Sequence, residues 1–237
     1  MINKIKLAFL CFAIFASQAH AEFTDIDWKV AGDSAATYDS TSNLEWLKLT
    51  QTDNMSIADV QAELALGSDG QFYGWRLPTE NEVETMMTNM FGSLISEGNS
   101  NRTWGSNQSS IYSAFANAFH WNYAYAKTGY PAQYDYRSYG LYSTESGETL
   151  MSGVRYTNYP KTGQNHKRVY TTYLYEDHAS DSYTEDFSNT SYGVFLVSDG
   201  GFTINSPALN AVSNVSVPFV SSLSLIGLLG LRRRKSD

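Results

Sequence analysis

Apolar residues recur at helical spacing in the first half of the chain, behind residues that can cap a helix. Ser56 and Asp59 have the spacing of a capping pair, and Ile57 and Val60 begin an apolar stripe after them. This pattern predicts a first helix that starts at Ser56 and ends at the glycine-containing segment 67–70.

A second helix is predicted directly after Pro78. Thr79 and Glu82 form a capping box, and Glu80 adds negative charge to the first turn, which is favourable against the helix dipole. The inward-facing stripe of this helix consists of Val83, Met86, Met87 and Met90. A third, short helix is predicted with Ser110 as its cap and with Ile111 and Phe115 facing inward.

The strand-like segments have alternating or β-branched and aromatic residues, and most of them lie in the second half of the chain. They are residues 23–30, 36–39, 44–49, 139–142, 149–156, 168–175 and 192–197. Residues 92–105 are polar and are predicted to be a loop, and an acidic run, 176–186, follows one of the late strands. Early helices followed by an antiparallel sheet indicate an α+β domain.

The N-terminus has the order of a secretory signal peptide. Lys4 and Lys6 precede a ten-residue apolar run, and Ala19-His20-Ala21 fits the small-x-small pattern read by signal peptidase. We therefore expect cleavage after Ala21 and export across the cytoplasmic membrane.

The C-terminus has the pattern of a membrane or sorting segment. Residues 215–231 are mostly apolar, a length at the lower limit for a membrane span, and Arg232, Arg233, Arg234 and Lys235 follow directly. The segment resembles the PEP-CTERM type of sorting signal, which a membrane transpeptidase recognises. Val217-Pro218-Phe219 stands where that type has Pro-Glu-Pro, so Pro218 is the expected position of the proline motif.

These ends divide the chain into four parts: a signal peptide (1–21), a globular domain (22–205), a linker (206–214) and the C-terminal segment (215–237). Residues 22–214 contain ten Lys and Arg against 23 Asp and Glu, a net charge of −13. Such a charge is repelled by phosphates and disfavours nucleic acid as a partner. The only cysteine, Cys11, lies in the signal peptide, which excludes disulfides and thiol chemistry in the exported protein.

The sequence offers little support for catalysis or a transition-metal site. The three histidines after the signal peptide have no metal-binding spacing, and neither a nucleophile elbow nor a phosphate-binding glycine loop occurs. Calcium is one interpretation of the acidic run, with Asp177, Asp181, Glu185 and Asp186 as oxygen ligands. These residues lack the order of an EF-hand, and a solvated acidic loop is the other interpretation.

A tyrosine-rich region in the middle of the chain is the candidate binding site. Aromatic faces can stack on sugar rings while polar groups bind hydroxyls. The residues proposed for such contacts are Trp121, Tyr123, Tyr125, Tyr134, Tyr136 and Arg137. The alternative is a tyrosine-rich loop that covers the sheet.

Residues 44–83 carry a resemblance to a known domain family. N-L-E-W-L-K-L, a short helix and then F-Y-G-W-R-L-P-T-E-N-E-V resemble the family typified by the C-terminal domain of the Lcl collagen-like adhesin. The resemblance extends over 38–198 and implies a C-type-lectin-like fold, with helices packed on a twisted antiparallel sheet. It implies a binding or adhesion module without catalytic residues to transfer. The motif residues Trp46, Trp75, Arg76, Pro78, Thr79 and Glu82 are expected to be architectural.

These observations predict an exported, surface-sorted protein that acts as a binding, adhesion or matrix module in contact with polysaccharide. Two alternatives stay open: a secreted hydrolase of surface glycans, and a purely structural coat protein. A hydrolase would need an acid/base pair in one cleft, and the spacing of the acidic residues shows none.

Overall fold

The computed structural model describes residues 23–95, 101–128, 132–160 and 168–204. The predicted signal peptide, the predicted linker and the predicted C-terminal sorting segment, including Pro218 and the Arg232–Lys235 cluster, lie outside these residues. Within them, no helix combines the length and the apolar character that crossing a membrane requires.

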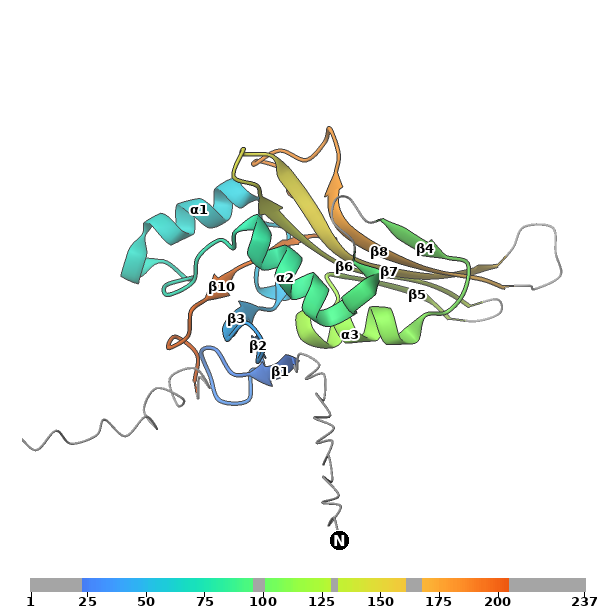
Figure 1. The fold of residues 1–237 in the computed structure, drawn as a ribbon, viewed down its shortest axis with the longest axis horizontal. Coiled ribbons are helices and arrows are strands. Elements are labelled where there is room, and N and C mark those ends of the chain that lie inside the picture. Colours follow the sequence, from blue (N-terminus) through green and yellow to red (C-terminus); the bar gives the residue numbers. More distant parts are fainter. Residues whose placement is uncertain (1–22, 96–100, 129–131, 161–167, 205–237) are drawn as a thin grey trace, which may run out of the picture.

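The described domain is α+β, as the sequence predicts, but it contains two sheets rather than one (Figure 1). The smaller sheet has the strand order β1 (Phe23–Ile26), β2 (Ala36–Asp39), β3 (Leu44–Leu47) and β10 (Val197–Ser198). The larger sheet has the order β4 (Arg102–Trp104), β8 (Arg168–Ala179), β7 (Thr149–Pro160), β6 (Gln133–Ser143) and β5 (Tyr123–Lys127). All of these neighbours pair antiparallel, while β9 (Gly193–Val194) pairs parallel with β6.

All three predicted helices are present. They are α1 (Ile57–Ala65), α2 (Glu80–Phe91) and α3 (Ser109–Phe119), with short 3-10 turns at Leu49–Gln51, Gly67–Asp69 and Gly92–Leu94. The capping pairs predicted for the first two helices are confirmed, because Ser56 and Thr79 each form a complete capping box. The predicted cap of the third is wrong: Gln108 is the N-cap, its side chain forms no capping bond, and Ser110 lies inside the helix.

The strand predictions were wrong in length or place at several points. The first strand ends at Ile26 because the carboxylates of Asp27 and Asp33 bind backbone N–H groups of residues 28–35 and fold them into a turn. Part of the predicted loop 92–105 is strand β4. The predicted strand 192–197 is two short strands, β9 and β10, which belong to different sheets.

One apolar core lies between the larger sheet and helices α2 and α3, which cover one face of the long strands in Figure 1. Trp46 and Phe195 are fully buried in it, with ring centroids 6.0 Å apart. A second core forms where α1 and the smaller sheet meet the opposite face, and it includes Trp28, Phe72, Trp75 and Leu141. The long strands run past α1 in Figure 1, and on the far part of that opposite face Tyr125, Tyr159 and Val169 are exposed.

Candidate functional site

Alternation along the long strands decides which side chains reach the uncovered face of the larger sheet. Tyr142, Val154 and Leu174 are in the core under α2 and α3. Residues at odd separations from them along the same strands therefore point to the opposite side. Part of that side is packed on α1. We call the remaining part of that side the open face.

Four residues from four neighbouring strands form a continuous row on the open face. Tyr123 of β5 pairs with Arg137 of β6, Arg137 with Arg155 of β7, and Arg155 with Tyr173 of β8. The row therefore has two cations at its centre and one tyrosine at each end. We refer to these four residues as the Tyr–Arg row.

The two arginines of the row share one carboxylate. Arg137 donates from Nε and Nη2 to the two oxygens of Asp135, at 3.2 and 2.8 Å. Arg155 does the same from the other side, at 3.0 and 2.8 Å, and the Tyr159 hydroxyl adds a bond of 3.0 Å. The Asp135 side chain is only 4% exposed, whereas those of Arg137 and Arg155 are 28% and 27% exposed.

Each tyrosine of the row lies against the neighbouring guanidinium. The Arg137 guanidinium carbon is 4.9 Å from the centre of the Tyr123 ring, and that of Arg155 is 5.5 Å from the centre of the Tyr173 ring. These are cation–π distances, and they restrain both guanidinium planes. The arrangement is thus preorganised, with partly exposed cations between partly exposed aromatic rings.

Asp135 is held in its ionised form. Burial alone would raise the pKa of its carboxyl group, but the hydrogen bonds and charges of Arg137 and Arg155 outweigh burial and lower the pKa to about 2. A lowered pKa means that the carboxylate stabilises the folded state at every pH above its ordinary value of 3.8. That contribution is lost as the pH falls from this value through the folded pKa.

We therefore expect Asp135→Asn to remove roughly 2 kcal/mol of stability at pH 5. The difference between the variant and the parent should shrink on going to pH 2, because the parent then loses the same ionic contribution. Urea unfolding at a series of pH values measures both proteins. A difference that stays constant over this range would contradict an ionised Asp135 between Arg137 and Arg155.

The six residues predicted to contact sugar do not come together in one site. Tyr123, Tyr125 and Arg137 lie on the open face, with Tyr125 40% exposed. Trp121, Tyr134 and Tyr136 belong to the helix-covered side, where the Tyr136 ring lies 5.5 Å from Trp121 and 5.9 Å from Tyr134. The segment around them is strand rather than a loop covering the sheet, because residues 133–143 form β6.

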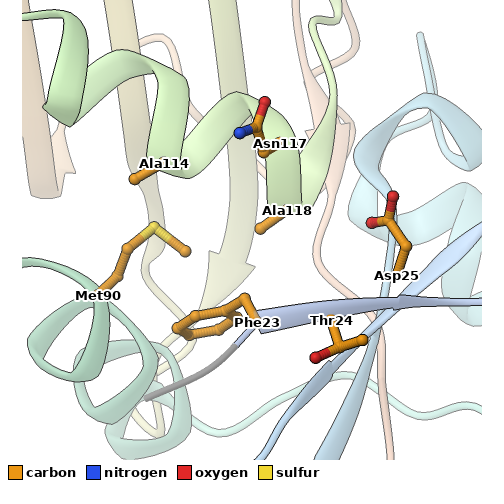
Figure 2. Close-up of a pocket in the computed structure, with 7 residues that line it drawn as sticks. All are labelled: Phe23, Thr24, Asp25, Met90, Ala114, Asn117 and Ala118. Carbon is orange, nitrogen blue, oxygen red and sulfur yellow. The ribbon is translucent and has the colours of Figure 1, made fainter. Parts of the chain in front are cut away.

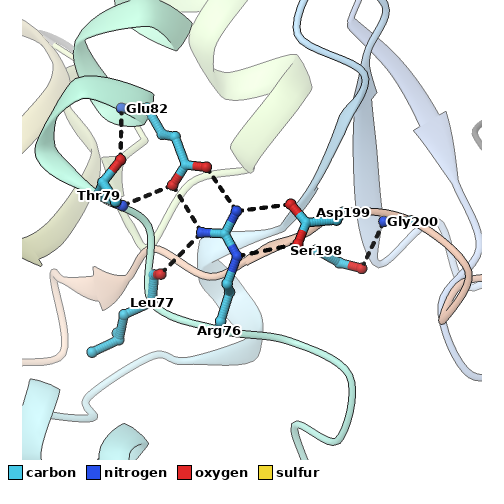
Figure 3. Close-up of polar contacts among 7 residues, drawn as sticks. All are labelled: Arg76, Leu77, Thr79, Glu82, Ser198, Asp199 and Gly200. Atoms are coloured by element: carbon cyan, nitrogen blue, oxygen red, sulfur yellow. Dashed lines mark hydrogen bonds and ion pairs between the residues drawn. The ribbon is translucent and has the colours of Figure 1, made fainter.

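The sequence motif around Arg76 forms the junction between the smaller sheet and α2 (Figure 3). Arg76 donates to both carboxylate oxygens of Glu82, at 2.8 and 2.7 Å, and to Asp199 at 2.8 Å. Glu82 also completes the capping box with Thr79. Hydrogen bonding by Arg76 is the main cause that lowers the pKa of Glu82 to about 2.

Three other motif residues are packed in the interior of the domain. Trp46 is fully buried, Pro78 is buried at the start of α2, and Trp75 meets Trp28 edge-on at 5.8 Å. An architectural role for all six motif residues stays a prediction.

The acidic run 176–186 contains the residues that the sequence offers as calcium ligands. Among the described residues, no three acidic, histidine or cysteine side chains are placed to hold a metal ion together. Asp177 lies in strand β8 and accepts a hydrogen bond from the hydroxyl of Tyr142 in β6. Asp181, Glu185 and Asp186 follow that strand, and calcium binding by them stays a hypothesis.

A cavity of about 550 Å³ lies between β1, α2 and α3 (Figure 2). Its wall includes Phe23, Met90 and Asp25, and Asp25 is the ionic group there. The Asp25 carboxylate accepts a 2.6 Å bond from Lys48, whose buried ammonium also lies 3.0 Å from Nε2 of His120. The charge of Asp25 is thus already neutralised within the protein, and the cavity offers less to a polar ligand than the open face does.

Sequence reasoning missed Asp135, Arg155, Tyr159 and Tyr173 as members of the site. A signal was present, because Tyr134-Asp135-Tyr136-Arg137 alternates aromatic and charged residues with the period of a strand. No known protein family, curated protein sequence or solved structure matches the chain.

Proposed function

We propose that the chain is an exported, surface-sorted binding protein whose domain contacts extracellular polysaccharide through the open face, without catalysing a reaction. The observation that carries this proposal is the Tyr–Arg row, in which partly exposed aromatic and cationic groups are held in fixed positions on a sheet. Rigid strands keep such a constellation in place better than loops do.

The chemistry of the row suits a sugar chain. The apolar face of a pyranose ring can pack on tyrosine, while guanidinium N–H groups donate to ring and hydroxyl oxygens. Tyr125 and Tyr159 lie farther along the same face and are 40% and 36% exposed, so aromatic surface continues beyond the row. A face several strands wide suits an extended polymer rather than a small enclosed ligand.

The state of Asp135 favours binding over hydrolysis. A glycosidase needs a carboxylic acid whose pKa is raised, so that it can protonate the leaving group. Asp135, the carboxylate of this cluster, has a pKa lowered to about 2 and both of its oxygens are engaged. Its position supports the role of a counter-ion that fixes two arginines.

Export and sorting belong to the same proposal. The signal peptide 1–21 would be removed by signal peptidase, and the segment 215–237 would be processed or retained at the membrane by a sorting transpeptidase. The W-R-L-P-T motif and the capping box that begins at its threonine support an Lcl-type, C-type-lectin-like domain. Such an origin would agree with adhesion at the cell surface.

An array of bacterial surface polysaccharides, probed with the purified full chain, tests the binding function. The double variant Tyr123→Ala and Tyr173→Ala should bind its ligands about tenfold or more weakly, because two ring contacts are lost. The matched control is Tyr134→Ala with Tyr170→Ala, which removes two partly buried tyrosines from the opposite face of the same sheet.

The control should retain the affinity of the parent. Equal losses in the two double variants would place the binding surface elsewhere. Absence of polysaccharide binding by the parent chain would overturn the proposed function itself.

A further inference from the structure

The Tyr–Arg row and Asp135 together carry one positive charge in excess. Two guanidinium groups share a single carboxylate, and no second acidic side chain forms an ion pair with either arginine among the described residues. This excess lies in a region, 22–214, whose net charge is −13. Two other cations of the domain are neutralised locally, Lys48 by Asp25 and Arg76 by Glu82 and Asp199.

The direction of the hydrogen bonds leaves one side of each arginine available. Both residues use Nε and Nη2 for Asp135. The Nη1 side of each guanidinium is left without a carboxylate in the described part of the chain. Both side chains are more than a quarter exposed, so an external group can reach them.

Resting on the proposed function, we infer that the sugar bound at the Tyr–Arg row is a uronic acid, whose carboxylate binds Arg137 and Arg155. A planar carboxylate matches the fork of guanidinium N–H groups and gives charge-assisted bonds. The cluster already holds one carboxylate in this way, and a second one makes its net charge zero. The pyranose ring of the same uronate packs on Tyr123 or Tyr173.

A neutral sugar fits the same place less well. Binding of a neutral sugar would remove water from two partly exposed cations without supplying a second negative charge. This loss of hydration costs free energy. An acidic peptide would satisfy the charge but would not present a pyranose face to the tyrosines. The row therefore favours an acidic sugar over both.

The test compares three polymers against the purified full chain by calorimetry: polygalacturonate, the same polymer after reduction of its carboxyl groups, and poly-L-glutamate. We expect polygalacturonate to bind at least about tenfold more tightly than either of the other two polymers. The carboxyl-reduced polymer loses the charge-assisted pair, and poly-L-glutamate loses the ring contacts. Its affinity should also fall as salt is added.

Two substitutions that each remove one positive charge test where the uronate binds. Arg137→Gln should weaken polygalacturonate binding about tenfold and should weaken binding of the carboxyl-reduced polymer by a clearly smaller factor. Lys127→Gln removes an exposed cation at the end of β5 and should change binding less than about twofold, because screened surface charges contribute little. Thermal unfolding checks the fold, and Arg137→Lys, which keeps the charge but loses the fork, serves as a second variant with the same expected direction.

Each contrary result has its own meaning. Equal binding of the carboxyl-reduced polymer would overturn the uronate inference and leave polysaccharide binding intact. Equal binding of poly-L-glutamate would overturn the choice of a sugar. Equal effects of the Arg137 and Lys127 substitutions would overturn the site, and binding of no polysaccharide would overturn the inference together with the proposed function.

Discussion

Replacing Trp46 with Ala is expected to lower the free energy of unfolding by about 3–5 kcal/mol, a loss typical of truncating a large buried aromatic residue. Trp46 is fully buried, and its ring meets Phe119 and Phe195 edge-on at 6.2 and 6.0 Å. Trp46 also lies in β3, between β2 and β10. The void left by the substitution would therefore lie where the smaller sheet meets the core. Urea unfolding of the two proteins measures the difference.

The control for this substitution is Tyr73→Ala. Tyr73 is also a large aromatic residue, but it is 56% exposed and touches Phe202 at the surface. We expect a loss below about 1 kcal/mol for this variant. Similar losses at the two positions would show that Trp46 is not at the centre of the core.

Replacing Gly153 with Ala should cost about 2–4 kcal/mol and should also disturb the Tyr–Arg row. A methyl group at this position would lie 2.1 Å from the carbonyl oxygen of Ser138, which is backbone and cannot rotate away. Gly153 also has φ +153° at the register shift between β7 and β8. The strands would have to separate next to Arg137 and Arg155, so overpacking and backbone strain combine.

Gly147→Ala separates these two effects. Gly147 has φ +82°, but a methyl group there would meet no atom within 4 Å. Backbone strain alone should cost about 1–2 kcal/mol, and the affinity for polysaccharide should be unchanged. If Gly153→Ala were no more destabilising than Gly147→Ala, the close approach of β6 and β7 at this point would be wrong.

The helices could be predicted from the sequence because their signals are local. Ser56 with Asp59, and Thr79 with Glu82, each specify a helix start within four residues, and the structure contains both capping boxes. The start of the third helix could not be predicted in this way. Its apolar stripe was found, but its first turn is held by tertiary contacts, such as the backbone N–H of Gln108 donating to the Thr172 hydroxyl, rather than by a serine cap.

The candidate site could be predicted only in part because it depends on strand pairing. Arg137 and Arg155 are 18 positions apart, and the register that makes them neighbours is not written in either strand alone. A grouping by closeness in sequence therefore combined Tyr136 with Arg137, although consecutive residues of a strand point to opposite faces. The contact between Phe195 and Gly140 is a second example, because these residues are far apart in the sequence. The Phe195 ring lies over Gly140, where a methyl group would come within 2.2 Å of it.

Polysaccharide bound at the Tyr–Arg row would change the Nε–H signals of the arginine side chains in nuclear magnetic resonance spectra. In ¹⁵N-labelled full chain, substitutions to Lys assign the signals of Arg76, Arg137 and Arg155. Addition of polygalacturonate should shift the Arg137 and Arg155 signals in proportion to the bound fraction and should leave Arg76 in place, since its guanidinium binds Glu82 and Asp199. Binding of the polymer with unchanged Arg137 and Arg155 signals would show that polysaccharide binds outside the Tyr–Arg row.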